Sequence, residues 1–170
     1  MKTAVMFAIL LFLSTSNHAD EKPLGLDRLD FLVGTWRGTS TGEPGQGQGQ
    51  RECARILNDR FLECKSTATY PPQKANPKGE VHVDRAIFSF DKRAKKLRLR
   101  QFHGEGFVNT YTEGQSLVFE TSEIENIPEG WRARETYKQL TADSWQETFE
   151  LAAPGKEFAV YSSSTLERVK

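Results

Sequence analysis

The sequence predicts an all-β fold, an up-and-down antiparallel β-barrel of about ten strands that a short helical turn precedes. Short runs of alternating apolar and polar residues follow one another almost to the end of the chain, and tight turn signals separate most of them. No segment has a helical pattern longer than two turns. Such a sheet must close on itself or pack on a second sheet, because an open edge exposes unpaired backbone groups. A β-sandwich with a filled core is therefore the competing architecture.

The composition indicates a folded domain without affinity for nucleic acid. The chain of 170 residues has the length of one domain. Eleven Phe, four Tyr and three Trp supply material for a core, which excludes a disordered chain. Lys and Arg together number 23, as do Asp and Glu, so the chain lacks the net positive charge that binding to nucleic acid requires.

Residues 1–19 have the layout of a secretory signal peptide. Lys2 precedes an unbroken apolar run from Ala4 to Leu13, which is too short to span a bilayer, and a small polar tail follows. We expect cleavage after Ala19, or alternatively after Ser16, which leaves residues 20–170 as a single β-barrel domain; an N-terminal buried helix is the other interpretation. No second apolar stretch approaches membrane length. The pattern predicts a periplasmic or secreted protein without stable membrane insertion.

The elements are predicted in chain order. The helical turn is expected at 26–32, and the strands at 31–41, 51–57, 60–69, 81–91, 96–103, 106–112, 117–121, 131–140, 145–151 and 158–167. The glycine-rich stretch 42–50 is expected to be a mobile hairpin or loop. The segment 70–79 contains three prolines, which fix φ and remove donors, so it is predicted to be a rigid connector.

The two cysteines lie on opposite sides of a predicted hairpin. With Asn58 and Asp59 at its tip, Cys53 lies directly opposite Cys64. Directly opposed residues of antiparallel strands have Cα atoms about 4.5–5.5 Å apart, a separation that a disulfide tolerates. We expect a disulfide in an oxidising compartment, and two inert thiols are the alternative. A redox pair would need the CxxC spacing, which these cysteines do not have.

The segment Leu29–Gly38, LDFLVGTWRG, resembles the first strand of calycin-type barrels, which include lipocalins, fatty-acid-binding proteins and nitrobindins. The resemblance implies that Gly34 and Trp36 close the bottom of the barrel under Arg168. Further segments resemble an exported barrel family that is grouped with heme-binding nitrobindin-like domains; they are 70–73, 76–80, 100–103, 105–108 and 124–128. This resemblance implies a ten-stranded barrel with a small-molecule pocket, and it makes heme a candidate cofactor.

A heme of the nitrobindin type is implied to be held by a His on one of the last strands. The predicted last strand, 157–168, contains no His. Tyr161 is the alternative axial ligand there, or else an aromatic residue that lines the cavity.

Alternation of side chains predicts which residues face the barrel interior. The interior is expected to be aromatic with a few polar groups, which are Gln101, His103, Asn109, Tyr111, Glu135, Tyr137 and Glu147. A mostly apolar lining with sparse polar groups is typical of a ligand pocket. His103 is the main candidate, because an imidazole can act near neutral pH as a neutral ligand or as a proton donor. Alternatively it is a core histidine bonded to Asn109, Glu135 or a backbone carbonyl.

Two groups of residues are weighed for metal binding and for catalysis. One face of a predicted strand carries Glu80, His82 and Asp84. A metal ion would need further donors from a second strand. We therefore interpret this face as a solvated strand entrance and predict no metal site. Glu135 and Glu147 could form an acid–base pair across neighbouring strands, or could pair with Arg132 or Arg134. No GxSxG, HExxH or phosphate-loop motif occurs.

The sequence therefore predicts an exported β-barrel that binds and sequesters a small hydrophobic or heme-like molecule, with the stretch 42–50 as its gate. A small barrel enzyme of the lyase or isomerase type, using Glu135, Glu147 and His103, is the second hypothesis. A filled barrel that serves as a protein-interaction module is the third. The ligand and the oligomeric state cannot be predicted from the sequence.

Overall fold

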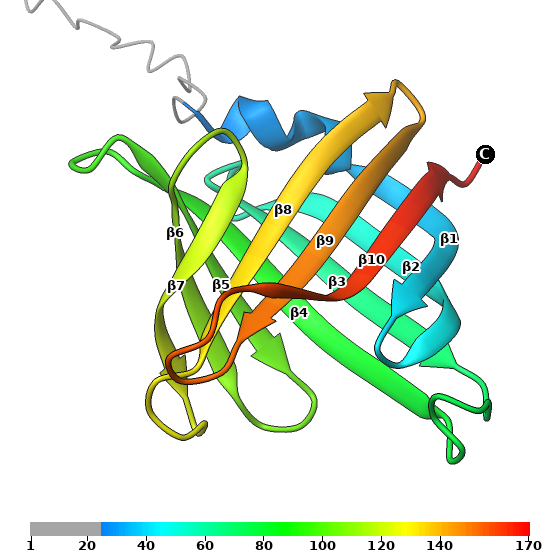
Figure 1. Ribbon diagram of the computed structural model, residues 1–170. Helices are drawn as coiled ribbons and strands as arrows, with labels where there is room; N and C mark the ends of the chain where they lie inside the picture. Colours follow the sequence, from blue (N-terminus) through cyan, green and yellow to red (C-terminus); the bar gives the residue numbers. More distant parts are fainter. Residues whose placement is uncertain (1–24) are drawn as a thin grey trace, which may run out of the picture.

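Ten antiparallel strands close into a barrel, as the sequence predicts (Figure 1). The computed structural model describes residues 25–170, so the predicted signal peptide at 1–19 lies outside the described residues. The elements are η1 (Leu26–Leu32), β1 (Gly34–Gly42), β2 (Gly45–Ile56), β3 (Phe61–Tyr70), β4 (Glu80–Asp91), β5 (Lys96–His103), β6 (Val108–Glu113), β7 (Val118–Glu125), β8 (Arg132–Thr141), β9 (Ser144–Ala152) and β10 (Ala159–Arg168). Each strand pairs with its neighbours along the chain, and the pairing of β1 with β10 closes the barrel. In the part of the chain that the structure describes, we find no helix with the length and apolar character to cross a membrane.

The 3-10 helix η1 covers one end of the barrel. Leu26, Leu29 and Leu32 recur every third residue, which places them on one face of a helix with three residues per turn. All three are fully buried. Beneath them lies an apolar core whose aromatic rings meet edge to face, with centroids 6.0 Å apart for Trp36 and Trp145.

Gly34, Trp36 and Arg168 lie together at this closed end. The Trp36 indole N–H donates to the carbonyl of Leu32 at 2.7 Å. The Arg168 guanidinium lies 4.1 Å from the centroid of the Trp36 ring and donates to the carbonyl of Val33 at 2.9 Å. A Cβ atom on Gly34 would lie 2.4 Å from the Arg168 side chain, and the φ of Gly34 is +133°, so this position requires glycine.

Of the two alternatives predicted for 42–50, a mobile hairpin or a loop, the hairpin is present: Gly42 pairs with Gly45 across a tight turn, and most of the stretch is regular strand. Residues 45–50 form the first half of β2 and pair with β1 on one side, and residues 48–50 pair with β3 on the other. Glutamine and glycine alternate here, so the glutamines face outward and the glycines face the interior. A side chain would not fit at Gly47, since a Cβ atom there would lie 2.6 Å from the Thr69 carbonyl oxygen. The gate predicted at 42–50 is therefore a paired strand and a short turn.

The predicted hairpin around the cysteines is confirmed. Cys53 pairs with Cys64 in the β2–β3 register, and the two form a disulfide with Cα atoms 4.1 Å apart. Positive φ values at Leu57, Asn58 and Asp59 make the turn at the tip. A structural disulfide forms in an oxidising environment, which indicates a location outside the cytoplasm.

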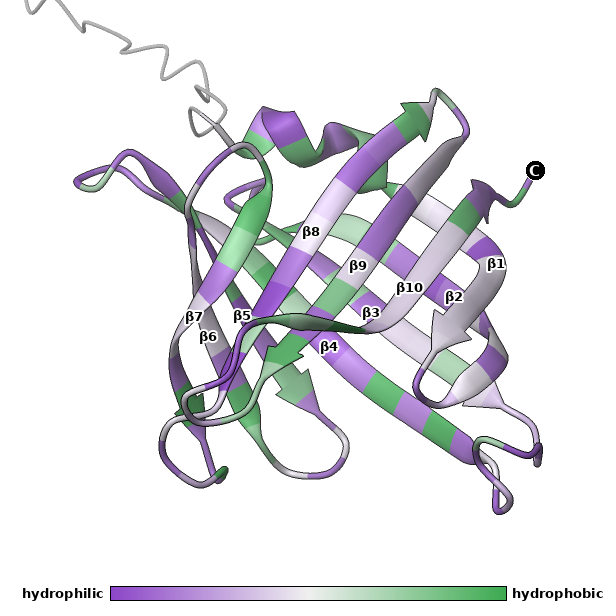
Figure 2. Cartoon of the chain, in the orientation of Figure 1, coloured by the Kyte–Doolittle hydropathy of each residue, from purple (hydrophilic) through white to green (hydrophobic). Residues whose placement is uncertain are grey.

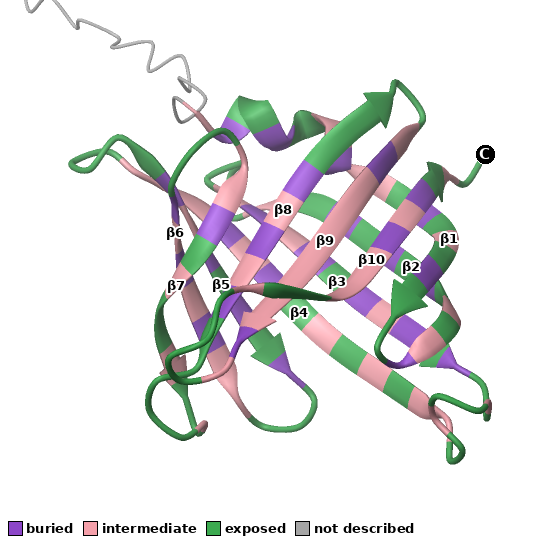
Figure 3. Cartoon of the chain, in the orientation of Figure 1, coloured by how far each residue is buried: buried purple, intermediate pink, exposed green. Residues whose placement is uncertain are grey.

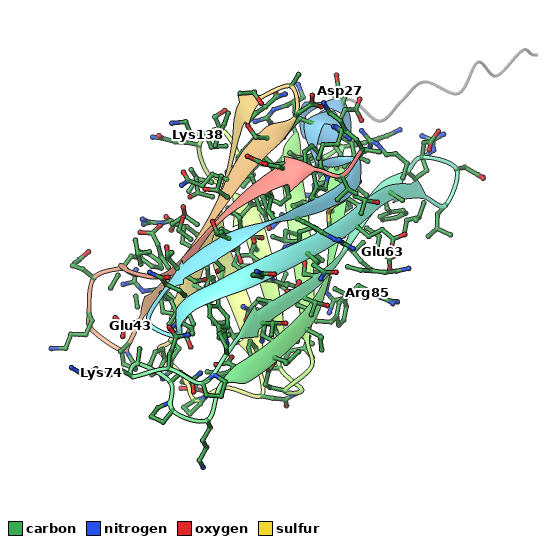
Figure 4. The ribbon with its side chains drawn as sticks, turned by 90° about the vertical axis from the view of Figure 1, so that its right-hand side faces the viewer. Asp27, Glu43, Glu63, Lys74, Arg85 and Lys138 are labelled. Atoms are coloured by element: carbon green, nitrogen blue, oxygen red, sulfur yellow. A yellow bond between two sulfur atoms is a disulfide. The ribbon has the colours of Figure 1, made fainter. Side chains whose placement is uncertain are left out.

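Buried and exposed residues alternate along most strands, so the barrel has a distinct inner and outer face (Figure 3). Hydropathy alternates in the same way along much of the sheet (Figure 2). Many charged residues lie on the outside, where Glu63 and Arg85 meet across β3 and β4 at 3.4 Å (Figure 4). The two ends differ, because η1 closes one while the other opens into a cavity.

Candidate ligand-binding site

A cavity of about 570 Å³ occupies the half of the barrel opposite η1, and this volume is typical of small-molecule sites. Its apolar wall consists of Phe107, Ile124, Trp131, Phe149, Leu151 and Tyr161, together with smaller residues. Its polar groups are Arg51, Glu80, His82, Asp84, Gln101, His103, Glu105, Asn109, Glu135 and Glu147, with two serines of β10. A filled barrel, the third hypothesis from the sequence, does not agree with this open space.

The structure brings most of the predicted site residues to this cavity. Gln101, His103, Asn109, Glu135, Glu147 and Tyr161 all line it. Two predicted ligand-binding residues, Tyr111 and Tyr137, do not line it. Both are buried one step further toward the closed end, where Tyr137 packs edge to face against Phe88 and Phe119. Alternation places both on the inner face, but depth along the barrel decides which inner residues reach the cavity.

Glu80, His82 and Asp84, interpreted from the sequence as a solvated strand entrance, all line the cavity, and they differ in their exposure to solvent. The side chain of Asp84 is only 6% exposed and that of His82 is 26% exposed. These residues continue the inward face of β4 on which Ala86 and Phe88 are buried. The alternation of β4 was therefore the signal that could have identified them.

His103 belongs to a chain of hydrogen bonds at the mouth of the cavity. His82 Nδ1 lies 2.8 Å from a carboxylate oxygen of Glu105, and His82 Nε2 lies 3.3 Å from His103 Nδ1. Glu105 accepts a hydrogen bond from His82 Nδ1, and one hydrogen bond joins the two imidazole rings. Burial and the neighbouring His82 lower the pKa of His103 to about 4, which keeps its ring neutral at pH 7. The ring also stacks on Phe107 with centroids 4.0 Å apart.

The chain continues through Asn109 toward the closed end. The Asn109 side-chain nitrogen lies 3.3 Å from His103 Nε2 and donates to the Tyr111 hydroxyl at 2.8 Å. Tyr111 donates in turn to Gln101 at 3.0 Å, and Gln101 donates to Asp84 at 3.4 Å. These contacts join the polar side chains of three strands, β4, β5 and β6, into one series. Among residues 25–170, however, the buried oxygen Oδ1 of Asn109 has no hydrogen-bond partner.

A buried ion pair and a carboxylic acid lie deeper in the cavity. Arg51 Nη2 lies 2.6 Å from Glu147 Oε2, and the two side chains are 8% and 12% exposed. Burial raises the pKa of Glu135 well above its ordinary value, and the negative charges of Glu147 and Asp84 raise it further. The neutral acid is therefore the favoured form of Glu135, and it carries an O–H donor. Within the described residues, Glu135 Oε2 is buried without a partner.

Glu135 and Glu147 share the cavity from the neighbouring strands β8 and β9. Neither pairs with Arg132 or Arg134, the alternative from the sequence; Arg134 instead contacts Glu120 and Glu150. Arg51, the partner of Glu147, was not predicted as a site residue. The two lie 96 positions apart in the chain, and no local pattern signals a contact that only closure of the barrel creates.

The residues present do not fit a heme held from the last strand. β10 contains no His, and Tyr161 is the residue of that strand with a ring against the cavity, 5.8 Å from the ring of Phe149. Burial raises the pKa of Tyr161, and carboxylates led by Glu80 raise it further. The neutral phenol is therefore favoured over the tyrosinate that would ligate iron.

Comparison with known proteins identifies the fold. No family model matches the chain, and no curated protein matches it. The crystal structure of Rv2717c from M. tuberculosis has a TM-score of 0.59 at 16% identity, covering 88% of this chain and 100% of that chain. A de novo designed fluorescence-activating β-barrel has a TM-score of 0.47 at 12% identity, covering 84% and 98% of the two chains. The redesigned barrel mFAP0, bound to DFHBI, has a TM-score of 0.47 at 13% identity, covering 81% and 99%. The likeness to Rv2717c shows that this chain has the fold of a natural closed β-barrel.

Proposed function

We propose that this protein is a periplasmic or secreted carrier, which binds one small, mostly apolar molecule inside its barrel. The observation that carries the proposal is the cavity of about 570 Å³ with an aromatic wall and the buried, unpartnered carboxyl oxygen of Glu135 in its depth. The resemblance of the LVGTWRG segment to calycin-type and nitrobindin-like barrels supports this role. The mechanism is sequestration, in which burial of the apolar body drives binding and the polar groups orient one end.

The charges of the cavity favour a neutral or cationic ligand over an anion. Five carboxyl groups line the cavity, whereas Arg51 is the only Lys or Arg among its described lining residues. Glu147 already neutralises Arg51, so no cation remains free for a ligand carboxylate. Burial of an unpaired anion next to Asp84 would be strongly unfavourable. The ligand class differs in this respect from that of a carrier of fatty acids.

Glu135 is the group that we expect to orient the ligand. Its unpartnered Oε2 is buried, and leaving such a group unsatisfied costs about 1–3 kcal/mol. A ligand oxygen or nitrogen that accepts the Glu135 proton would recover part of this free energy. An alcohol or amide at the end of an aromatic or aliphatic body meets this requirement. A protonated amine has no acceptor, and it would instead pair with one of the carboxylates that line the cavity.

The test uses three fluorescent probes that share one ring system, naphthalenemethanol, naphthalenemethylamine and naphthoate. We expect saturable binding of the alcohol and the amine, with dissociation constants at least tenfold lower than that of naphthoate. Glu135→Leu should weaken alcohol binding several-fold, because one neutral hydrogen bond contributes about 0.5–1.5 kcal/mol. Glu123→Gln, at an exposed position of β7, is the control and should change nothing. Tightest binding of naphthoate, or no saturable binding of any probe, would overturn the proposal.

A small barrel enzyme is the second candidate, and the state of Glu135 favours it. An acid with a raised pKa beside a carboxylate paired with Arg51 is a suitable arrangement for general acid–base chemistry on a bound molecule. The test is conversion of small organic compounds, followed by mass spectrometry, in the wild type and in a double variant with Glu135→Gln and Glu147→Gln. Turnover that the double variant retains would remove this acid–base pair from consideration.

A further inference from the structure

We propose that the mouth of the cavity holds a divalent transition-metal ion, which His82, His103 and Glu105 ligate. One donor atom from each of these three residues lies within 4.8 Å of the others. His82 comes from β4, His103 ends β5, and Glu105 follows in the next turn, so two strands and a turn supply the ligands. The second strand that a metal on β4 requires is therefore present.

The separations between donor atoms suit a small cation. In a tetrahedral site with metal–nitrogen distances of about 2.0–2.1 Å, ligand atoms lie about 3.3 Å apart. His82 Nε2 and His103 Nδ1 are 3.3 Å apart, and Glu105 lies 2.8 Å from the other nitrogen of the His82 ring. Glu105 would leave His82 Nδ1 to bind the ion, and its side chain is 48% exposed, so solvent lies on one side of it. Two imidazoles and one carboxylate are a ligand set for Zn²⁺ or Co²⁺ rather than for Mg²⁺ or Ca²⁺.

The side-chain amide of Asn109 lies against the other nitrogen of the His103 ring. When a metal binds Nδ1 of a neutral imidazole, Nε2 carries the proton and needs an acceptor. In the structure the Asn109 nitrogen faces His103 Nε2 at 3.3 Å and also donates to the Tyr111 hydroxyl at 2.8 Å. Metal binding at Nδ1 therefore requires the amide to turn so that its oxygen accepts the Nε2 proton, while Tyr111 turns its hydroxyl proton from Gln101 to the same oxygen. Asn109 is 2% exposed, so its side chain stays beside the ring in either orientation.

The charge and exposure of the cavity mouth agree with a cation that exchanges with solvent. The carboxylate of Asp84 lies 3.8 Å from His82 Nε2, which adds negative charge beside the site. The side chains of His82 and Glu105 are 26% and 48% exposed, so an ion can reach them from outside. Three protein ligands leave one position of a tetrahedral ion open, as in catalytic zinc sites.

The experiment is a calorimetric titration of the EDTA-treated full chain with Zn²⁺ alone. We expect one ion per chain, and we expect His82→Ala and Glu105→Gln each to weaken binding tenfold or more. Glu123→Gln, an exposed carboxylate away from the site, is the matched control and should bind like the wild type. Co²⁺ gives a second measurement, since a tetrahedral site produces intense visible absorption that His103→Ala should abolish.

Binding that is absent in the wild type, or that survives unchanged in His82→Ala, would overturn the metal site. His82 is partly exposed, so its replacement should leave the fold intact, which circular dichroism checks. No organic ligand takes part in the titration. Its result therefore stands apart from the proposal of a small-molecule carrier, which the naphthalene probes test.

Discussion

Replacement of Arg51 by methionine tests whether the cavity depends on its buried ion pair. Arg51 and Glu147 are 2.6 Å apart and only 8% and 12% exposed. Methionine retains much of the apolar length of arginine, but it leaves the carboxylate of Glu147 buried without a cation. Breaking a buried pair in this way costs about 3–5 kcal/mol. We therefore expect the free energy of unfolding, measured in urea by tryptophan fluorescence at neutral pH, to fall by about 3–5 kcal/mol.

Two comparisons separate loss of the pair from loss of packing. A double variant with Arg51→Met and Glu147→Leu carries neither charge, so it should recover most of the lost stability. Glu125→Gln removes a partner from the exposed pair of Arg100 and Glu125, whose side chains are 54% and 43% exposed, and it should cost less than about 1 kcal/mol. The reasoning is refuted if Arg51→Met is no more destabilising than Glu125→Gln, or if the double variant unfolds as easily as the single one.

Three further predictions concern the disulfide, the buried acid and the closure of the barrel. Serine at both Cys53 and Cys64 opens a loop with a sequence separation of 11 and should lower the free energy of unfolding by about 3 kcal/mol; an unchanged urea midpoint would contradict this. Burial raises the pKa of Glu135, so above about pH 4 the folded chain holds a proton that the unfolded chain releases. The free energy of unfolding should therefore fall as the pH rises above about 4, and Glu135→Gln should flatten this decline. Alanine at Gly38 would place a Cβ atom 1.8 Å from the backbone oxygen of Thr165, and it should lower the free energy of unfolding by about 1–3 kcal/mol. A melting temperature equal to that of the wild type would refute the close approach of β1 and β10.

The barrel could be predicted from the sequence because the period of two is a local property of each strand. Leu97, Leu99, Gln101 and His103 alternate with charged or exposed residues, and all four are buried. The register of the β2–β3 hairpin follows from the turn at Asn58 and Asp59 alone. The glycine-rich stretch was predicted as a mobile hairpin or loop because its composition resembles a flexible linker, and only the hairpin is present. Its alternation was the better signal for the strand, since the glycines face inward and a Cβ atom on Gly47 would collide with the backbone of Thr69.

The site could be predicted only in part, because its contacts cross the barrel. Alternation identifies Glu135 and Glu147 as inward residues, but the partner of Glu147 lies on β2, far away in the chain. The same limit applies to depth, since Tyr111 and Tyr137 face inward and still lie below the cavity. Closure and strand tilt decide which inner residues meet, and neither is encoded in a short stretch of sequence.

Most of the buried side-chain atoms without hydrogen-bond partners belong to residues that line the cavity. The described chain has five such side-chain atoms, and three of them belong to Arg51, Asn109 and Glu135, which line the cavity. Unsatisfied buried groups destabilise the free protein and concentrate where function requires them. The closed half, with η1, the edge-to-face aromatic rings and the disulfide nearby, supplies the stability that offsets this cost. A ligand that satisfies Glu135 should therefore raise the melting temperature of the wild type more than that of Glu135→Leu, and equal shifts would place the ligand elsewhere.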